Sequence, residues 1–478
     1  MERIEELHLN RNYSFHVSIK NNGTHFAGEL LLAPDACSLT IRGDVSQDRG
    51  PDFSYCSIDE LACKSFEGTF IMYGLKLTSG HSRALQHHPS SIWHFENKYS
   101  VSHVIFIRGS FTSKVSVRAI ELDSPSISRW VGSTTTQDEI VSRHNQGTLF
   151  SSRDAIPVEF EQALGDMGVL RIAYTLSTHY SSEAFNMGLR FPPVLLQIFN
   201  KLKSGAEAID CFRKIETIFS FLTGHPLDIQ TIRLINKEGP RYSLSLYTPR
   251  AAYIESDRSY PFFPLGRNRR FNDMGLPEFP LDSFTEYFSL PVEEQRYFEK
   301  YLRYRQMTNP EERFLGFFRL LEKLCFQKDF FLDEGKLIAF IDRARPFLGR
   351  HFGDKKNVNR LLKGVLRLNS SKLNSAGFIL KFLKMLPTHL LDGWIYAPSD
   401  IDAICKVRND LTHANEFEPE EFEIERKAKF IEVLLIISLL RKIGVSIDVG
   451  AFMTSRISGH YLIGRSVEAI SNSTDGTE

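Results

Sequence analysis

The residues best suited to chemistry lie in one short stretch late in the chain, which contains Arg408, Asn409 and His413. An arginine stays positively charged and offers several N–H donors that match the oxygens of a phosphate. A histidine gains and loses a proton near neutral pH. Asn409 and His413 are four positions apart, so on a helix their side chains share one face. This set is typical of a site that binds a phosphodiester and transfers a proton beside it.

A helix is predicted around this motif, because Ser399 or Asp400 can cap the free N–H groups at its start. Its apolar stripe consists of Ile401, Ile404, Cys405, Val407 and Leu411. At about 100° per residue, Arg408 projects close to the middle of that stripe. A guanidinium in such a place needs an anion or several acceptors nearby. Glu322 lies on the flank of an earlier predicted helix, where it would either orient the arginine or remain exposed.

Two interpretations of this motif follow. In the functional one, Arg408 holds a scissile phosphate and His413 acts as general base or acid during attack by a ribose 2′-OH. Asn409 then orients His413 or donates to the phosphate. In the structural one, Arg408 is a helix-surface residue and His413 is stabilised by the helix dipole. An Arg408 tied up in a structural ion pair, with His413 in open solvent far from any cleft or second copy, would favour the structural interpretation.

Length and composition limit the function further. With 478 residues, the chain is long enough for two or three domains. A net charge of zero argues against a constitutively basic nucleic-acid coat protein. The first residues have no apolar signal core, and the longest apolar run is too short to span a membrane, so we expect a cytoplasmic protein with no membrane partner. The six cysteines lack CxxC spacing, which predicts free thiols and no metal site.

The first half of the chain is predicted to be mainly antiparallel β structure. Its short segments alternate between apolar and polar residues, and this pattern predicts a sandwich or a barrel. These segments are 13–19, 26–32, 37–42, 68–77, 101–106 and 114–122. The middle portion predicts a strand at 169–176, a helix over 193–222 and a hairpin of 229–235 with 242–247. Residues 1–255 are therefore expected to form a β-rich domain, either as one body or as two lobes divided near residue 130.

The second half is predicted to be a helical bundle at 292–445, after a proline-rich linker at 256–291 and before a C-terminal tail at 446–478. Asn309 and Pro310 mark the start of one helix. A helix that begins at 337 is expected to end near Pro346 or Gly349. The other helices are expected at 354–368, 375–386, around Arg408, and from 419 to 443. The chain as a whole is predicted to be an α+β multidomain protein.

A basic stripe is predicted on the helix at 354–368, where basic residues are spaced four, three and four apart and so share one face. The residues are Lys356, Arg360, Lys363 and Arg367. Such a stripe can follow an RNA backbone, and a solvated outer face explains it equally well.

The motif also carries a family resemblance. Arg408-Asn409, three further residues and His413, late in a helical region, resemble the Arg-x4–6-His motif of HEPN domains. A mainly β first half followed by such a module resembles the ApeA-like proteins, which are bacterial anti-phage abortive-infection proteins. The resemblance implies a metal-independent endoribonuclease without a cofactor, which acts as a homodimer through its HEPN domain.

The resemblance further implies that infection triggers cleavage of host RNA, with transfer RNA as a candidate substrate. The β-rich half would sense the trigger, such as a phage protein, and restrain the nuclease until then. Attack by the 2′-OH would leave a 2′,3′-cyclic phosphate and spare DNA. Because some relatives lack activity, the alternative is a catalytically silent HEPN module that binds a nucleotide or a protein, with the β-rich half doing the recognition.

Overall fold

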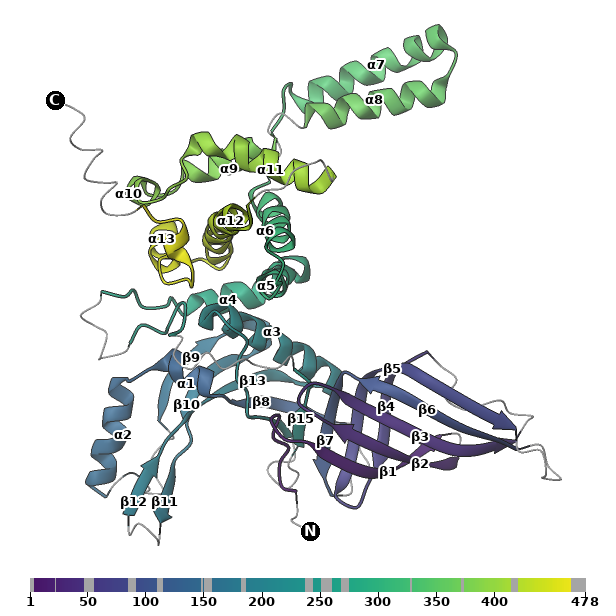
Figure 1. Ribbon diagram of the computed structural model, residues 1–478, viewed down its shortest axis with the longest axis vertical. Coiled ribbons are helices and arrows are strands. Elements are labelled where there is room, and N and C mark those ends of the chain that lie inside the picture. Colours follow the sequence, from purple (N-terminus) through teal and green to yellow (C-terminus); the bar gives the residue numbers. More distant parts are fainter. Residues whose placement is uncertain are drawn as a thin grey trace. The chain divides into compact units, whose positions relative to one another are not determined.

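The computed structural model divides into two compact units, Met1–Leu290 and Pro291–Glu478 (Figure 1). The described residues are 4–21, 23–46, 56–84, 92–109, 115–147, 149, 157–181, 186–236, 244–250, 260–267, 275–326, 329–370, 374–413 and 420–465. Within these ranges the first unit is mainly antiparallel β structure with a few helices, and the second is built from helices. The predicted α+β organisation is therefore confirmed.

Six strands at the start of the first unit form a closed antiparallel ring. They are β1 (Tyr13–Asn21), β2 (Thr24–Leu32), β3 (Cys37–Ser46), β4 (Ser57–Lys64), β5 (Gly68–Ala84) and β6 (Ile92–Val101). Their order is β4-β1-β2-β3-β6-β5, and a further pairing of β4 with β5 closes the ring. In β1, Phe15, Val17 and Ile19 are buried and alternate with exposed residues, which is the two-residue period of a strand with one face in a core.

The same sheet continues beyond the ring through seven more strands, which pair antiparallel throughout their described parts. In sheet order they are β7 (His103–Arg108), β15 (Leu244–Tyr247), β14 (Thr231–Asn236), β8 (Val117–Asp123), β13 (Pro193–Lys203), β10 (Val169–Tyr174) and β9 (Val158–Ala163). A separate hairpin joins β11 (Ser177–Ser181) and β12 (Asn186–Arg190). The predicted hairpin of β14 and β15 is confirmed, and the residues between them, 237–243, lie outside the described ranges.

The prediction of one helix over 193–222 is wrong for its first part and right for the rest. Residues 193–203 form β13, and the helix α3 spans only Gly205–Thr223. Leu195, Ile198 and Leu202 have helical spacing, but sheet pairing on both sides of β13 fixes an extended backbone instead. The helix begins where Ser204 forms a capping box: its hydroxyl accepts from Glu207 N, and the Glu207 carboxylate accepts from Ser204 N.

The capping box gives a stability prediction. Ser204→Ala should lower the free energy of unfolding by about 0.5–2 kcal/mol, because an N–H group in the first turn of α3 loses its acceptor. Chemical denaturation followed by circular dichroism measures the change. Ser142→Ala, inside α2 (Thr135–Asn145), is the matched control, and an equal loss there would contradict a capping role for Ser204.

An aromatic cluster around Trp130 belongs to the first unit. Trp130 lies in α1 (Pro125–Val131), and its Nε1 donates to Phe263 O at 2.8 Å. Its ring contacts Phe160, Phe219, Phe279 and Phe284. The described residues 260–267 and 275–290 lie within the first compact unit, and residues 282–289 form the helix α4 (Asp282–Ser289). Here the structure differs from the expected linker at 256–291, because Phe262, Phe263, Phe279 and Phe284 are buried.

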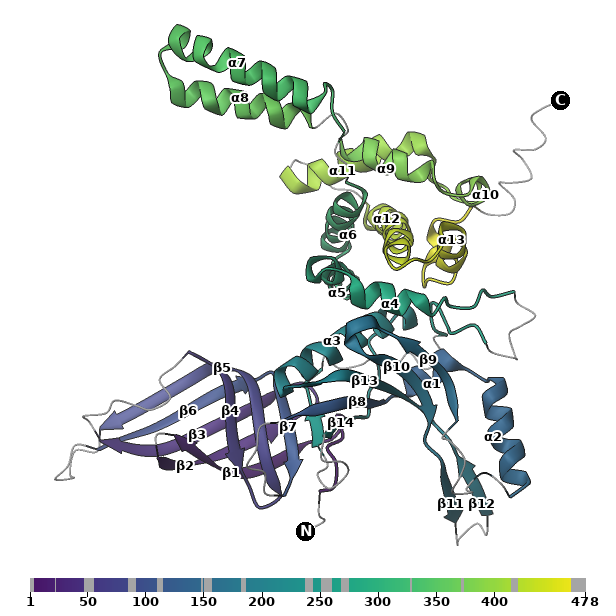
Figure 2. The ribbon, with the colours of Figure 1, turned by 180° about the vertical axis from the view of Figure 1, so that it is seen from behind.

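The second unit is organised around α12 (Glu421–Lys442), whose residues 430–440 are all buried. Its other elements are α5 (Val292–Arg305), α6 (Pro310–Cys325), α9 (Ser375–Leu383), α10 (Thr388–Asp392), α11 (Ile401–His413) and α13 (Ile447–Thr454). The helix α12 packs against α6 and α13 (Figure 2). As predicted, Asn309 caps α6 and Pro310 occupies its first turn. The expected tail begins with α13, which Ser446 caps.

A buried charge cluster joins α5 and α12. The Glu432 carboxylate is 3% exposed. It accepts from Tyr301 Oη at 3.0 Å and from Lys429, and lies 3.6 Å from Arg305 Nε. Burial opposes the charged form, but Lys429 and Arg305 outweigh it and lower the pKa of Glu432.

Two helices, α7 (Glu334–Phe352) and α8 (Lys355–Asn369), form an antiparallel hairpin with a small core of its own. The buried residues of that core are Leu337, Ile341, Val358 and Leu362. The predicted end near Pro346 or Gly349 is wrong, since α7 contains Pro346 and ends at Phe352, where Gly353 caps it with a φ of +69°. Proline removes one N–H donor from the helix, but packing of Leu348 against the α8 core continues the helix past it.

Candidate active site

The motif lies on the helix α11, and Arg408 is on the side of this helix that its apolar pattern predicted. Ile401, Ile404 and Val407 are buried, and Arg408 is half-buried beside them. The expected capping is different, however. Residues Pro398–Asp400 form a short 3-10 turn, and the Asp400 carboxylate accepts from Ala397 N at 2.7 Å, so it bonds backward instead of to the first N–H groups of α11.

Three acceptors hold the guanidinium of Arg408. Nη2 binds the Glu322 carboxylate and donates to Ser375 Oγ at 2.8 Å, and Nη1 donates to Asn409 Oδ1 at 2.8 Å. Ser375 Oγ in turn donates to Glu322. The Arg408 and Glu322 side chains are 23% and 26% exposed. The cation is therefore fixed while part of it still faces solvent.

Each partner of Arg408 comes from a different helix. Glu322 lies in the last turn of α6, and Ser375 is the first residue of α9, where the Asn374 side chain caps the helix by accepting from Gly377 N at 2.8 Å. The guanidinium carbon lies 5.1 Å from the ring centre of Phe318, one turn before Glu322 on α6. The expectation that Glu322 orients the arginine is met, and Ser375 is a partner that spacing along the sequence did not indicate.

The ion pair gives a second stability prediction. Glu322→Gln should lower the free energy of unfolding by about 1–3 kcal/mol, because a half-buried cation loses its counter-charge. Urea denaturation of the variant measures this change. Glu311→Gln, exposed on the first turn of the same helix, should cost less than about 1 kcal/mol. Equal effects at both positions would mean that the Glu322 pair contributes nothing of its own.

Asn409 and His413 lie on the exposed side of α11, and His413 is its last residue. Asn409 binds the arginine, whereas we expected it to orient His413 or to donate to phosphate. The structure thus meets one condition of the structural interpretation, an ion-paired Arg408. Of the other condition, the exposure of His413 is also met. The remaining part of that condition is the distance of His413 from a cleft or from a second copy of the chain.

The thiol of Cys405, within the motif helix, has a raised pKa. Burial raises the pKa of Cys405 to about 11, an effect that Arg408 opposes and Glu322 reinforces. All six cysteines lie in described positions and are free thiols, as predicted.

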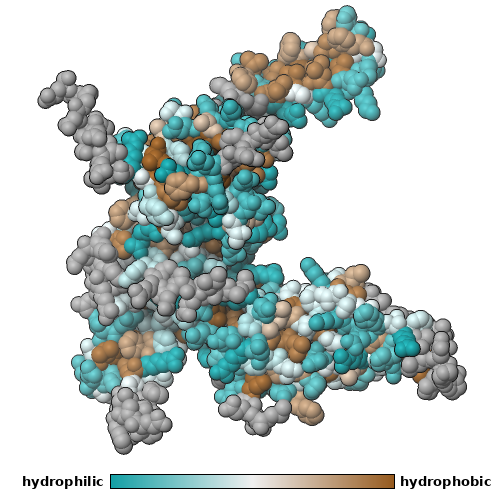
Figure 3. All heavy atoms as spheres, viewed as in Figure 1, coloured by the Kyte–Doolittle hydropathy of each residue, from teal (hydrophilic) through white to brown (hydrophobic). Residues whose placement is uncertain are grey.

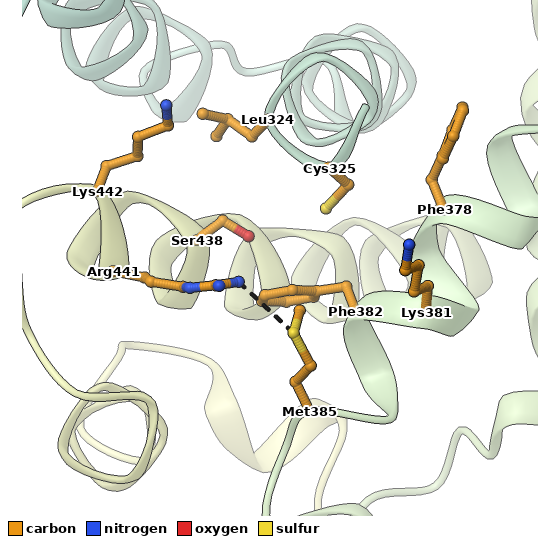
Figure 4. A pocket seen from close by; sticks show the side chains of 9 residues that line it. All are labelled: Leu324, Cys325, Phe378, Lys381, Phe382, Met385, Ser438, Arg441 and Lys442. Carbon is orange, nitrogen blue, oxygen red and sulfur yellow. Dashed lines mark hydrogen bonds between the residues drawn. The ribbon is translucent and has the colours of Figure 1, made fainter. Parts of the chain in front are cut away.

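A pocket of about 350 Å³ is lined by residues of α6, α9 and α12 and by Met385 (Figure 4). Cys325 follows Glu322 by one turn on α6, and Phe378 follows Ser375 by one turn on α9, so the pocket neighbours the Arg408 cluster. Its lining includes aromatic and aliphatic side chains. Its charged lining residues are Lys381, Arg441 and Lys442. Lys442 also pairs with Glu294 at 3.0 Å. Sequence reasoning missed this pocket, because cations in the last turns of α9 and α12 are ordinary partners of the helix dipole.

The predicted basic stripe lies elsewhere, on the exposed side of α8. Lys356, Arg360, Lys363 and Arg367 are all exposed. They share one face as predicted, but they belong to the hairpin with α7 and do not line the pocket beside Arg408.

A comparison with known families completes the description of the chain. The family model described as ApeA N-terminal domain 1 matches residues 12–282, which is more than half of the chain. The chain belongs to the ApeA family. The ApeA match covers the closed ring of strands, the rest of the sheet and the aromatic cluster up to the start of α4. No curated protein and no solved structure matches the chain significantly.

Membership of the ApeA family connects the chain with anti-phage defence. Over the described ranges, none of the helices is both long and apolar enough to cross a lipid bilayer. Nor do any three His, Cys, Asp or Glu side chains of the described residues gather as they would around a metal ion.

Proposed function

We propose that this ApeA-family chain is a cytoplasmic abortive-infection effector whose helical unit is a HEPN endoribonuclease. It would act without a metal ion or cofactor, as a homodimer through that unit, and cleave host RNA, with transfer RNA as a candidate. The β-rich unit would sense a phage protein and restrain the nuclease. The observation that carries the proposal is the half-buried Arg408, fixed by three acceptors five residues before His413.

The hydrogen bonds of Arg408 are compatible with phosphate binding. A guanidinium has five N–H donors, and Arg408 makes three bonds, with Nε buried and unpaired. One Nη1 hydrogen therefore remains for a phosphate oxygen. Glu322 and Ser375 then act as positioning residues, because they fix the planar group before the RNA arrives, so that little reorganisation is needed during reaction.

The proposed reaction is a transesterification within the RNA. His413 takes the proton of the 2′-OH, the 2′ oxygen forms a bond to phosphorus, and the bond from phosphorus to the 5′ oxygen breaks. The leaving 5′ oxygen takes up a proton from water, so the products are a 2′,3′-cyclic phosphate and a 5′-OH. Arg408 stabilises the charge that develops on the phosphate. The basic stripe on α8 would bind more distant RNA phosphates, and the pocket beside Arg408 would take a neighbouring nucleotide.

The test uses the purified full-length chain with host RNA, with and without extract from infected cells. Cleavage should leave 2′,3′-cyclic phosphate ends, persist in chelator, and fail when a deoxyribose replaces the ribose at the cut site. Cleavage of the deoxy substrate, or loss of cleavage in chelator, would contradict the proposed chemistry.

The second candidate is a catalytically silent HEPN module that binds a nucleotide or a protein, with recognition by the β-rich unit. The ion pair of Arg408 with Glu322 and the exposed position of His413 favour it. Absence of cleavage under every triggering condition, together with nucleotide or protein binding, would support this candidate over the first.

A further inference from the structure

The α7–α8 hairpin exposes an unusual amount of apolar surface. Phe340, Phe347, Leu361 and Leu368 are 67%, 63%, 62% and 64% exposed. Val365 is exposed as well. Figure 3 shows hydrophobic side chains gathered along both helices of the hairpin. Isolated exposed apolar residues are common on proteins, but a contiguous patch of this kind marks a contact surface.

These residues lie on one side of the hairpin. At about 100° per residue, Phe340 and Phe347 lie roughly 80° from the centre of the buried residues of α7. On α8, the exposed apolar residues lie roughly 90° around the helix from its buried residues, in the same rotational sense as on α7. They are Leu361, Val365 and Leu368. The two helices run antiparallel (Figure 1). For antiparallel helices, offsets in the same rotational sense place both sets of residues on one face of the hairpin. We call this set of five residues the apolar face.

The hairpin has little else to stabilise it. Its own core consists of four buried residues with Leu348 and Leu366 packed against them. A pair of helices with so small a core is marginal, since helices gain most of their stability from the packing of an apolar face. Covering the apolar face would therefore supply packing that the hairpin lacks.

The charges of the hairpin decide what covers it. From Glu334 to Asn369 there are nine Lys and Arg residues but only three Asp and Glu. Around the axis of α8, the centre of the basic stripe lies roughly 135° from the buried residues, and the apolar face lies on the other side of those buried residues. An acidic helix, an RNA or an anionic membrane would be drawn more strongly to the stripe, where four cations cluster, than to the apolar face. On α7 that face is bordered by two exposed cations, Lys336 and Arg343.

We propose that the apolar face binds the same face of a second copy of this chain, in a four-helix contact with two-fold symmetry. The two basic stripes then point away from each other, so the like charges do not meet. At roughly 100 Å² of exposed side chain for each large residue, two such faces bury about 1,000 Å², which is the lower limit for a specific interface. This inference names the contact of the proposed homodimer, and it holds whether or not the chain cleaves RNA.

The experiment is the mass of the full-length chain in solution, by sedimentation at micromolar concentrations. The unchanged chain should be a dimer, and Phe340→Glu with Phe347→Glu should raise the dissociation constant by about 100-fold or more. The matched control, Arg360→Glu with Lys363→Glu on the opposite side, should remain dimeric. Because screening weakens repulsion between the stripes, dimerisation should hold or tighten as salt is raised.

A cross-link keeps the test independent of misfolding in the glutamate variant. Val365→Cys, in an otherwise unchanged chain, should form a 365-to-365 link between two copies with a short bismaleimide. A monomer at all concentrations, a dimer that the face variant leaves intact, or the absence of this link would overturn the proposal. So would association that weakens with salt and requires an acidic protein, RNA or anionic vesicles. RNA cleavage is assayed separately, so a failed dimer and a failed nuclease give different results.

Discussion

His413→Ala should lower the rate of RNA cleavage by about 10²–10⁴-fold, because the 2′-OH loses the group that takes its proton. The fold should be unaffected, since His413 is exposed at the end of α11. Single-turnover cleavage at saturating RNA measures the rate, and mapping of RNA ends after induction tests the same loss in cells. A variant that cleaves and kills as well as the unchanged chain would exclude His413 from the chemistry.

Arg408→Lys is the companion change. It keeps the positive charge but loses the planar fork that meets Glu322, Ser375 and a phosphate together. We expect a loss of about 10²–10³-fold in cleavage, with a smaller loss of stability than for Arg408→Ala, which would leave Glu322 unpaired. Lys406→Ala, exposed on the same helix, is the control and should cleave normally. Retained activity in Arg408→Lys would mean that charge alone suffices.

Glu432→Gln should be the most destabilising single change described here, at about 3–5 kcal/mol, because Lys429 and Arg305 lose the anion between them. The loss should appear as a lower denaturation midpoint in urea. Glu421→Gln, exposed at the start of α12, is the matched control and should cost less than about 1 kcal/mol. A loss below 1 kcal/mol for Glu432→Gln would mean that the charge of Glu432 contributes little to the stability of the fold.

The same cluster predicts a pH dependence. The pKa of Glu432 is lower in the folded chain than its ordinary value of 4.5, so its ionisation stabilises the fold above that pH. The stabilisation is lost as the pH falls through the folded-state pKa. The gap in unfolding free energy between the unchanged chain and Glu432→Gln should therefore be constant near neutral pH and shrink below about pH 4.5. A gap that widens in acid would have the wrong sign.

Local signals predicted the helical unit well. The cap at Asn309 and Pro310 gave α6 its start, and apolar spacing placed Arg408 on the buried side of α11. Glu322 could be singled out because it flanks the stripe of its own helix. Ser375 could not, because its bond to the guanidinium depends on how α9 packs, and no local pattern encodes that contact.

Long-range pairing explains the errors in the β-rich unit. Residues 193–203 have apolar spacing that suits either a helix or a strand, and only the partners β8 and β10 decide between them. Likewise, prolines between 256 and 291 suggested a linker, but the phenylalanines among them pack around Trp130. Sequence pattern identifies which residues are apolar, whereas their partners come from the fold.

The hairpin interrupts the chain between two of the three residues that hold the guanidinium. Glu322 precedes it and Ser375 follows it, so both anchors stand at the points where the chain leaves and rejoins the bundle. Immobilising the hairpin would remove conformational freedom from both anchor points together. Dimerisation would then also order the residues that hold Arg408. The fraction of chains with a correctly oriented Arg408 would therefore rise with the concentration of the chain.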